Sequence, residues 1–172
     1  MHSRTLSALL VPLLWIPVGG CGQHPGSESP HKKESRSLSP EDQSSNRYDL
    51  ERDEHRGGHT LSRHVARTDG QLRERLQKEL NISAASTWTD RKTAEETVAA
   101  ALLAERDRID SWVRRGERRP NLALHFDARQ PIGRSLRRDA SEAVTCTSAV
   151  IVLRADGSDS YYVLTTYPED RK

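Results

Sequence analysis

The apolar residues of this chain change their spacing near residue 120, and this change constrains the fold most strongly. From about residue 60 to residue 113 they recur at the three- and four-residue intervals of amphipathic helices. Beyond Gly116 and Pro120 the interval approaches two, which is typical of strands. Helices followed by strands predict an α+β domain with an antiparallel sheet.

Two short helices are predicted at the start of this region. The first runs from Thr60 to about Ala66. Thr68-Asp69-Gly70-Gln71 has the pattern of a capping box, which predicts the start of a second helix that carries Arg75. The apolar face of that helix is formed by Leu72, Leu76 and Leu80.

Residues 84–88 are expected to form a loop or a short extended segment. A longer helix then begins after a cap at Asp90 or Thr93, and its apolar positions are Val98, Leu102, Ile109, Trp112 and Val113. The predicted strands cover residues 122–126, 132–136, 143–153 and 161–167. Asp156-Gly157-Ser158 supplies a hairpin turn between the last two strands.

The N-terminus has the pattern of a secretory signal peptide. His2 and Arg4 precede an apolar run that ends at Val18-Gly19-Gly20-Cys21. The run is shorter than the roughly 20 residues that span a bilayer. We therefore expect residues 1–21 to be a lipoprotein signal peptide that leaves Cys21 lipidated and the protein tethered to a membrane. Cleavage nearby, with release of a free secreted protein, is the alternative.

Residues 22–57 are rich in Ser, Pro, Glu, Lys, Arg, His and Asp and have almost no aliphatic residues. Such a segment cannot bury enough apolar surface to offset the entropy of ordering, so we predict a disordered polar linker. The folded domain is predicted to cover residues 58–172. Gly22 lacks the acidic character associated with inner-membrane retention, which favours an exported protein at the outer membrane or cell surface.

Charge and cysteine content exclude few functions. The 27 basic and 25 acidic residues give a net charge of +2, too small to indicate a nucleic-acid partner by itself. Several arginines cluster in the middle of the chain, where they form either a solvated surface or a phosphate-steering one. With Cys21 acylated, only Cys146 remains, so no intramolecular disulfide forms, and its alternating surroundings predict a buried thiol.

A series of short motifs extends across the predicted domain. They are Gly58-His59-Thr60-Leu61, Arg63-His64-Val65, Ala85-Ser86-Thr87-Trp88, Ala94-Glu95 and Thr165-Thr166-Tyr167-Pro168. In order and spacing they resemble the bacterial ribonuclease A-like toxin domain, which is the C-terminal toxin domain of contact-dependent growth inhibition CdiA proteins. The resemblance covers residues 58–172 and implies a kidney-shaped, two-lobed ribonuclease A-like fold without disulfides.

The resemblance also implies an active site. It places the catalytic histidine at His64, the phosphate ligand at Arg75, and a pair of hydroxyl groups at Thr165 and Tyr167. These residue types suit RNA cleavage, because a histidine transfers protons near neutral pH and an arginine offers a planar fork of donors to phosphate oxygens. Thr165 and Tyr167 are two residues apart on a strand and therefore share a face.

The general acid is not assigned by the sequence. Tyr167, a water molecule and His125 on a middle strand are the candidates, and Tyr167 is favoured. His59 is expected to have a structural or capping role near the site. The sequence contains no Gly-rich phosphate loop, zinc-ligand spacing or Ser-His-Asp arrangement, so we expect no metal and no cofactor.

The sequence therefore predicts an exported, lipid-anchored, metal-independent endoribonuclease that acts as an antibacterial toxin. Its product would be a 2',3'-cyclic phosphate. The expected partners are an RNA substrate, a membrane through lipidated Cys21 and, from the resemblance alone, a cognate immunity protein. The alternative is a non-catalytic surface lipoprotein that uses the same fold as a binding module.

Overall fold

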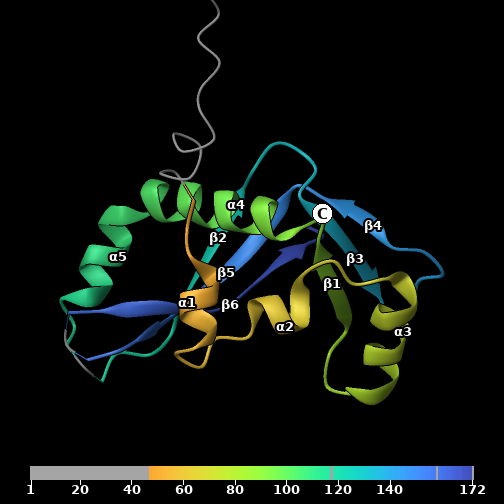
Figure 1. Ribbon diagram of the computed structural model, residues 1–172, viewed down its shortest axis with the longest axis horizontal. Helices are drawn as coiled ribbons and strands as arrows, with labels where there is room; N and C mark the ends of the chain where they lie inside the picture. Colours follow the sequence, from red (N-terminus) through yellow and green to blue (C-terminus); the bar gives the residue numbers. More distant parts are fainter. Residues whose placement is uncertain (1–46, 117, 158, 172) are drawn as a thin grey trace, which may run out of the picture. The chain divides into compact units, whose positions relative to one another are not determined.

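Two three-stranded antiparallel sheets, β1-β3-β4 and β2-β5-β6, form the frame of the protein (Figure 1). The computed structural model describes residues 47–116, 118–157 and 159–171. The predicted signal peptide, its Cys21 and linker residues 22–46 lie outside this part of the chain. Within it, no helix is both long and apolar enough to cross a bilayer.

Helices precede most of the strands in the described residues. The helices are α1 (Leu50–Glu54), α2 (Thr60–His64), α3 (Asp69–Lys78), α4 (Arg91–Ala104) and α5 (Arg106–Val113). The strands are β1 (Ala84–Trp88), β2 (Leu122–Asp127), β3 (Gly133–Arg137), β4 (Val144–Cys146), β5 (Ser148–Ala155) and β6 (Tyr161–Glu169). The predicted α+β class is confirmed, and the described residues contain no disulfide.

Strand β1 is the one strand that lies among the helices. It pairs with β3 in a register that runs from Ala84 opposite Arg137 to Trp88 opposite Gly133. The sequence indicated only a loop or short extended segment here, because five residues without apolar alternation carry little sign of a strand. This pairing brings residues that lie about 50 positions apart into one sheet.

The run at residues 143–153, predicted as one strand, is two strands in different sheets. β4 pairs with β3, whereas β5 pairs with β2 and β6. Thr147 separates them, and its carbonyl accepts a hydrogen bond from the backbone of Ala128 at 2.9 Å. The alternating pattern continues through Thr147, so it could not show that the chain changes sheets there.

The sequence predicted where the helices begin more accurately than where they end. Both hydrogen bonds of the predicted capping box join Thr68 and Gln71, and Asp90 rather than Thr93 caps α4. The prediction for Leu80 was wrong, because α3 ends at Lys78 and leaves that side chain 81% exposed. The predicted long helix is divided at Glu105 into α4 and α5.

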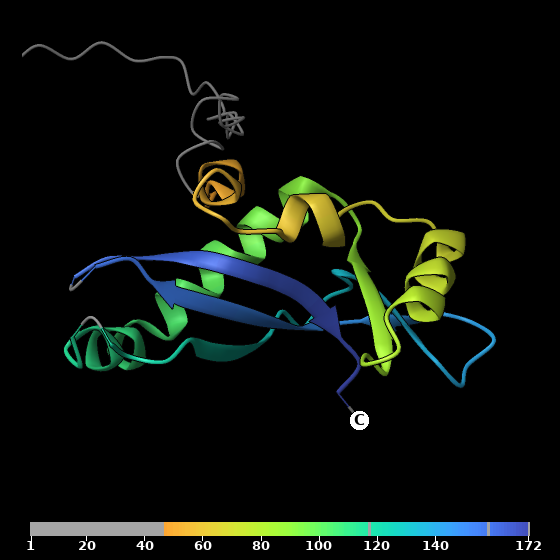
Figure 2. The ribbon, with the colours of Figure 1, turned by 90° about the horizontal axis from the view of Figure 1, so that it is seen from below.

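The folded region begins before residue 58, which corrects the predicted end of the linker. Leu50 belongs to the main core, and the carboxylate of Asp53 is fully buried. That carboxylate accepts hydrogen bonds from the Tyr48 hydroxyl and the Val163 backbone, each at 2.6 Å. These contacts fix α1 against β6. The sequence carries no sign of them, because this segment contains few apolar residues. Figure 2 shows α1 and α2 on the same side of β6.

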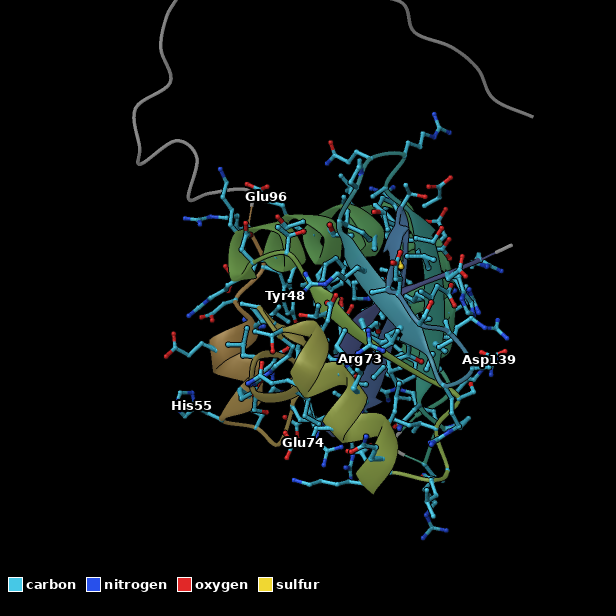
Figure 3. All side chains as sticks on the ribbon, turned by 90° about the vertical axis from the view of Figure 1, so that its right-hand side faces the viewer. Tyr48, His55, Arg73, Glu74, Glu96 and Asp139 are labelled. Carbon is cyan, nitrogen blue, oxygen red and sulfur yellow. The ribbon has the colours of Figure 1, made fainter. Side chains whose placement is uncertain are left out.

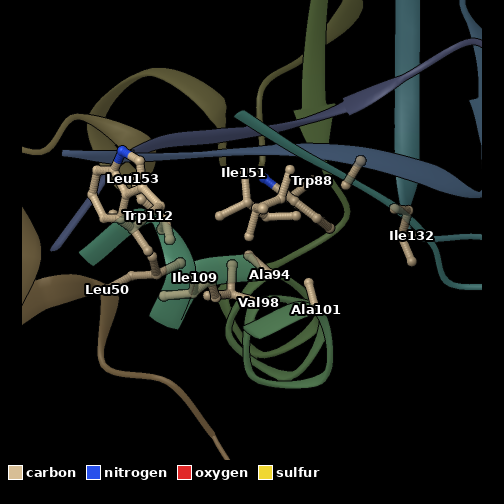
Figure 4. Close-up of a cluster of buried hydrophobic side chains, with 13 residues drawn as sticks. Leu50, Trp88, Ala94, Val98, Ala101, Ile109, Trp112, Ile132, Ile151 and Leu153 are labelled. Carbon is tan, nitrogen blue, oxygen red and sulfur yellow. The ribbon is translucent and has the colours of Figure 1, made fainter. Parts of the chain in front are cut away.

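Most of the core lies between the pair α4 and α5 and the β2-β5-β6 sheet. Figure 4 shows this cluster, in which Val98 and Ile109 from the helices approach Trp88 and Ile151 from the strands. A smaller cluster joins α3 to the other sheet through Leu72, Leu76, Ala85 and Leu136. Cys146 is buried as predicted, and burial raises the pKa of its thiol to about 11, which keeps it protonated.

Candidate active site

Residues of α2, α3, β1, β3 and β6 line a cavity of about 500 Å³. All four residues predicted for the active site line it, although Arg75 and Tyr167 are 92 positions apart in the chain: they are His64, Arg75, Thr165 and Tyr167. The volume is within the usual range of small-ligand sites, about 300–1,000 Å³. The structure thus brings together in one cavity every side chain that the resemblance implied.

His64 is the last residue of α2 and is only 6% exposed. Its Nδ1 lies 3.2 Å from the Ser86 carbonyl oxygen and 3.5 Å from Arg75 Nη1. These two contacts require opposite tautomers, since a carbonyl only accepts and a guanidinium only donates. The shorter contact with Ser86 is the better hydrogen bond, so we assign the proton to Nδ1. Nε2 then carries the lone pair that a general base needs.

Burial lowers the pKa of His64 to about 4, and the positive charge of Arg75 adds to this effect. The imidazole is therefore neutral at physiological pH. A neutral histidine can accept a proton but has none to donate from Nε2. This electrostatic environment suits His64 to the role of base and leaves the role of acid to another group.

Arg75 extends from α3 toward His64. Its Nε donates to the Glu79 carboxylate at 3.3 Å, one helical turn later, which orients one edge of the guanidinium. Nη1 faces His64 across 3.5 Å. An arginine remains charged in such a setting, so the cavity keeps a fixed positive group beside its neutral base.

Tyr167 and Thr165 face the cavity from β6. The Tyr167 ring lies against the His64 ring, with centroids 5.4 Å apart and planes tilted by 31°. Burial raises the pKa of Tyr167, so its hydroxyl keeps its proton. The Thr165 hydroxyl oxygen is shielded from solvent and has no hydrogen-bond partner among the described residues. The Thr165 hydroxyl thus has unused hydrogen-bonding capacity at the cavity wall.

Hydrogen bonds to the backbone of β6 hold α2 and β1 against that strand. The Thr60 hydroxyl accepts from the backbone of Thr166 at 3.0 Å, and the Trp88 indole donates to the Thr166 carbonyl at 3.1 Å. Gly58 makes the approach possible, because a Cβ there would lie 2.8 Å from the carbonyl oxygens of Asp53 and Val163. These contacts fix the separation between His64 and the strand residues.

The two other histidines considered in the sequence have different positions. His59 lines the cavity and occupies the N-cap position of α2, but its side chain makes no capping hydrogen bond. Burial and the nearby Arg63 lower the pKa of its imidazole. His125 is not among the residues that line the cavity; its Nδ1 lies 2.8 Å from an oxygen of Glu169, which does line it.

Several cavity residues were not recognised as site residues from the sequence. Ser135 and Arg137 alternate along β3 and face the cavity, and Glu169 follows Tyr167 by two positions on β6. Strand alternation could have identified these side chains. Ser86 acts on His64 through its backbone carbonyl, for which the sequence carries no signal. Among the described residues, no group of three or more His, Cys, Asp or Glu could hold a metal ion.

Comparison with known families assigns this helix-and-sheet domain, with its buried histidine and partly exposed arginine, to the ribonucleases. Residues 58–168 match the family described as the bacterial CdiA-CT RNAse A domain. The chain belongs to this family, and the predicted resemblance is confirmed.

A solved structure supports the same assignment. The chain is similar to one described as a CdiA-CT/CdiI complex from Y. kristensenii, with 31% identity and a TM-score of 0.60. The similarity covers 66% of this chain and 100% of that one. A search among curated proteins gave no match.

Proposed function

We propose that this ribonuclease cleaves RNA by transphosphorylation, with His64 as the general base. Nε2 removes the proton from a 2'-hydroxyl, the 2'-oxygen attacks the adjacent phosphorus, and the 5'-oxygen leaves with a proton from the general acid. The product is a 2',3'-cyclic phosphate. The observation that carries this mechanism is the neutral, buried imidazole of His64, which lies beside Arg75 and Tyr167 in one cavity.

Arg75 binds the phosphate in this proposal and stabilises the charge that develops on its oxygens. Its Nη1 lies close enough to His64 that a phosphate bound by the guanidinium would place a neighbouring 2'-hydroxyl near the base. The hydroxyls of Thr165 and Tyr167 donate to the same phosphate. The general acid is a water molecule or Tyr167, whose phenol keeps its proton because its pKa is raised.

The decisive experiment is cleavage of total bacterial RNA by the purified full-length protein in the presence of EDTA. We expect degradation that leaves cyclic phosphate ends, with no activity for the folded His64→Ala variant. Inactivity of both proteins would instead favour the non-catalytic binding module. Activity that EDTA abolishes would exclude the metal-independent mechanism.

We also propose that the protein is an exported, lipid-anchored antibacterial toxin with a cognate immunity protein. The CdiA-CT family supports the role of toxin, and the description of the Y. kristensenii structure names a complex with CdiI. The motif that ends at Cys21 supports export and lipidation. Cys21→Ser should release the protein from membranes, and unchanged membrane fractionation would refute the lipid anchor.

A further inference from the structure

The residues that line the cavity include groups of both charges. Arg75 on α3 and Arg137 on β3 are cationic, whereas Glu169 at the end of β6 and Asp170 after it are acidic. A phosphate needs only donors, so these carboxylates cannot bind the phosphate groups of RNA. A nucleobase, in contrast, presents both donors and acceptors along its edges. The cavity therefore combines cationic groups suited to phosphate with carboxylates suited to a base.

Glu169 is held in place by neighbours outside the cavity. Its Oε1 accepts from His125 Nδ1 at 2.8 Å and lies 3.5 Å from Arg171 Nε. Both contacts use the same oxygen, which leaves Oε2 for a ligand. The Glu169 side chain is 21% exposed, so its carboxylate is partly shielded from water, and hydrogen bonds to it are stronger than on an open surface.

Strand register explains how His125 reaches this carboxylate. His125 lies opposite Val150 on β5, and Val150 lies opposite Tyr167 on β6. Residues opposite one another share a face of the sheet, and Glu169 shares the face of Tyr167 by alternation. His125 thus lies on the cavity-side face of the β2-β5-β6 sheet, two strands from Tyr167.

We propose that Glu169, positioned by His125, binds the amino edge of a nucleobase next to the scissile phosphate. This inference rests on the proposed ribonuclease function and adds a base preference to it. Cytosine, adenine and guanine each carry an exocyclic amino group that donates to a carboxylate. Uracil has no amino group, and its single N–H lies between two carbonyl oxygens that repel Glu169. The enzyme therefore disfavours uracil at this position.

The test uses short oligodeoxynucleotides that contain one ribonucleotide, so that only one bond can be cleaved. In two series, the base on each side of that bond is varied among the four bases. We expect wild-type kcat/KM to be lowest for uracil at one of the two positions. Glu169→Gln should lower the ratio of amino-bearing bases to uracil about tenfold, the value of one good carboxylate–base contact. Glu96→Gln, an exposed change on α4 (Figure 3), should leave the ratio unchanged.

His125 is a positioning residue in this proposal, and its variants separate that role from a structural one. His125→Gln keeps a donor for Glu169 and should retain the base preference. His125→Ala should reduce the preference in the direction of Glu169→Gln while the thermal unfolding midpoint stays close to that of His125→Gln. A preference that His125→Ala leaves intact would exclude the positioning role.

Two outcomes would overturn the role of Glu169. One is an unchanged base preference in Glu169→Gln, and the other is an equal loss for all four bases, which would indicate a role in chemistry or folding. Dissociation constants for fully deoxy oligonucleotides of the same sequences provide a second readout. Wild type could bind these deoxy oligonucleotides with different affinities and yet cleave none of the ribonucleotide substrates. That result would exclude the proposed ribonuclease function but support the base site at Glu169.

Discussion

The two walls of the candidate active-site cavity hold their polar side chains in different ways. The helical wall carries His64 and Arg75, whose side chains are fixed by Ser86 and Glu79. The wall formed by β6 carries Thr165 and Tyr167, whose hydroxyls are not committed to such contacts, and the Thr165 oxygen has no partner among the described residues. The helical wall thus has a base and a cation that are already held in place, whereas the hydroxyls of the β6 wall are not. Substitutions on each wall test this difference.

Removal of the base on the helical wall should have the largest effect. We expect His64→Ala to lower kcat by roughly 100- to 10,000-fold, the usual contribution of a positioned proton-transfer group. The measurement is the rate of RNA cleavage, with circular dichroism to verify that the variant is folded. A loss smaller than tenfold would mean that another group removes the 2'-hydroxyl proton.

The same imidazole should make stability depend on pH. The pKa of His64 is about 4 in the folded protein, below the reference value of 6.5, so the unfolded chain binds more protons between those values. The free energy of unfolding should therefore fall as pH decreases from 6.5 toward 4, by up to roughly 3 kcal/mol from this residue.

His64→Gln provides the control for this effect, because glutamine does not titrate. Between pH 6.5 and pH 4, His64→Gln should lose less free energy of unfolding than wild type, as measured by urea denaturation. Equal losses in both proteins would show that His64 has an ordinary pKa.

Arg75→Lys tests whether the helical wall needs a planar fork or only a positive charge. Lysine keeps the charge but loses the bidentate geometry and the contact between Nε and Glu79. We expect kcat/KM to fall by about 30-fold, between the effects of losing a hydrogen bond and losing a charge. Arg73→Lys is the matched control, since Arg73 lies on the same helix (Figure 3) and contacts Ser141 outside the cavity. An equal effect of both changes would argue against phosphate binding by Arg75.

Tyr167→Phe should have the smallest effect of the series if the hydroxyl only donates to the phosphate. Phenylalanine keeps the ring packing against His64, so about a tenfold loss of kcat is expected for one hydrogen bond to a charged group. A loss as large as that of His64→Ala would identify Tyr167 as the general acid. Tyr161→Phe, on the same strand but packed against Trp112, is the control and should retain full activity.

The same difference explains how much of the site could be predicted from the sequence. The helical wall has a local signal in the capping box at Thr68, which the structure confirms, whereas the role of His64 came from the resemblance. Thr165 and Tyr167 share a strand face, as alternation predicted. The resemblance supplied the expectation that both walls meet, since no local pattern joins residues about 100 positions apart.

Long-range pairing accounts for most of what could not be predicted. The two-sheet arrangement depends on the change of partner at Thr147, and α1 depends on buried hydrogen bonds to Asp53 in a polar segment. The contact of His125 with Glu169 arises from the register of three strands. Each of these features is set by tertiary contacts that override local composition.

An NMR titration of the His64 imidazole in the full-length protein shows whether this side chain is a neutral base. We expect a pKa of about 4 and a neutral tautomer with the proton on Nδ1, which leaves Nε2 as the base. A pKa near the reference value of 6.5, or a neutral ring with its proton on Nε2, would contradict this expectation.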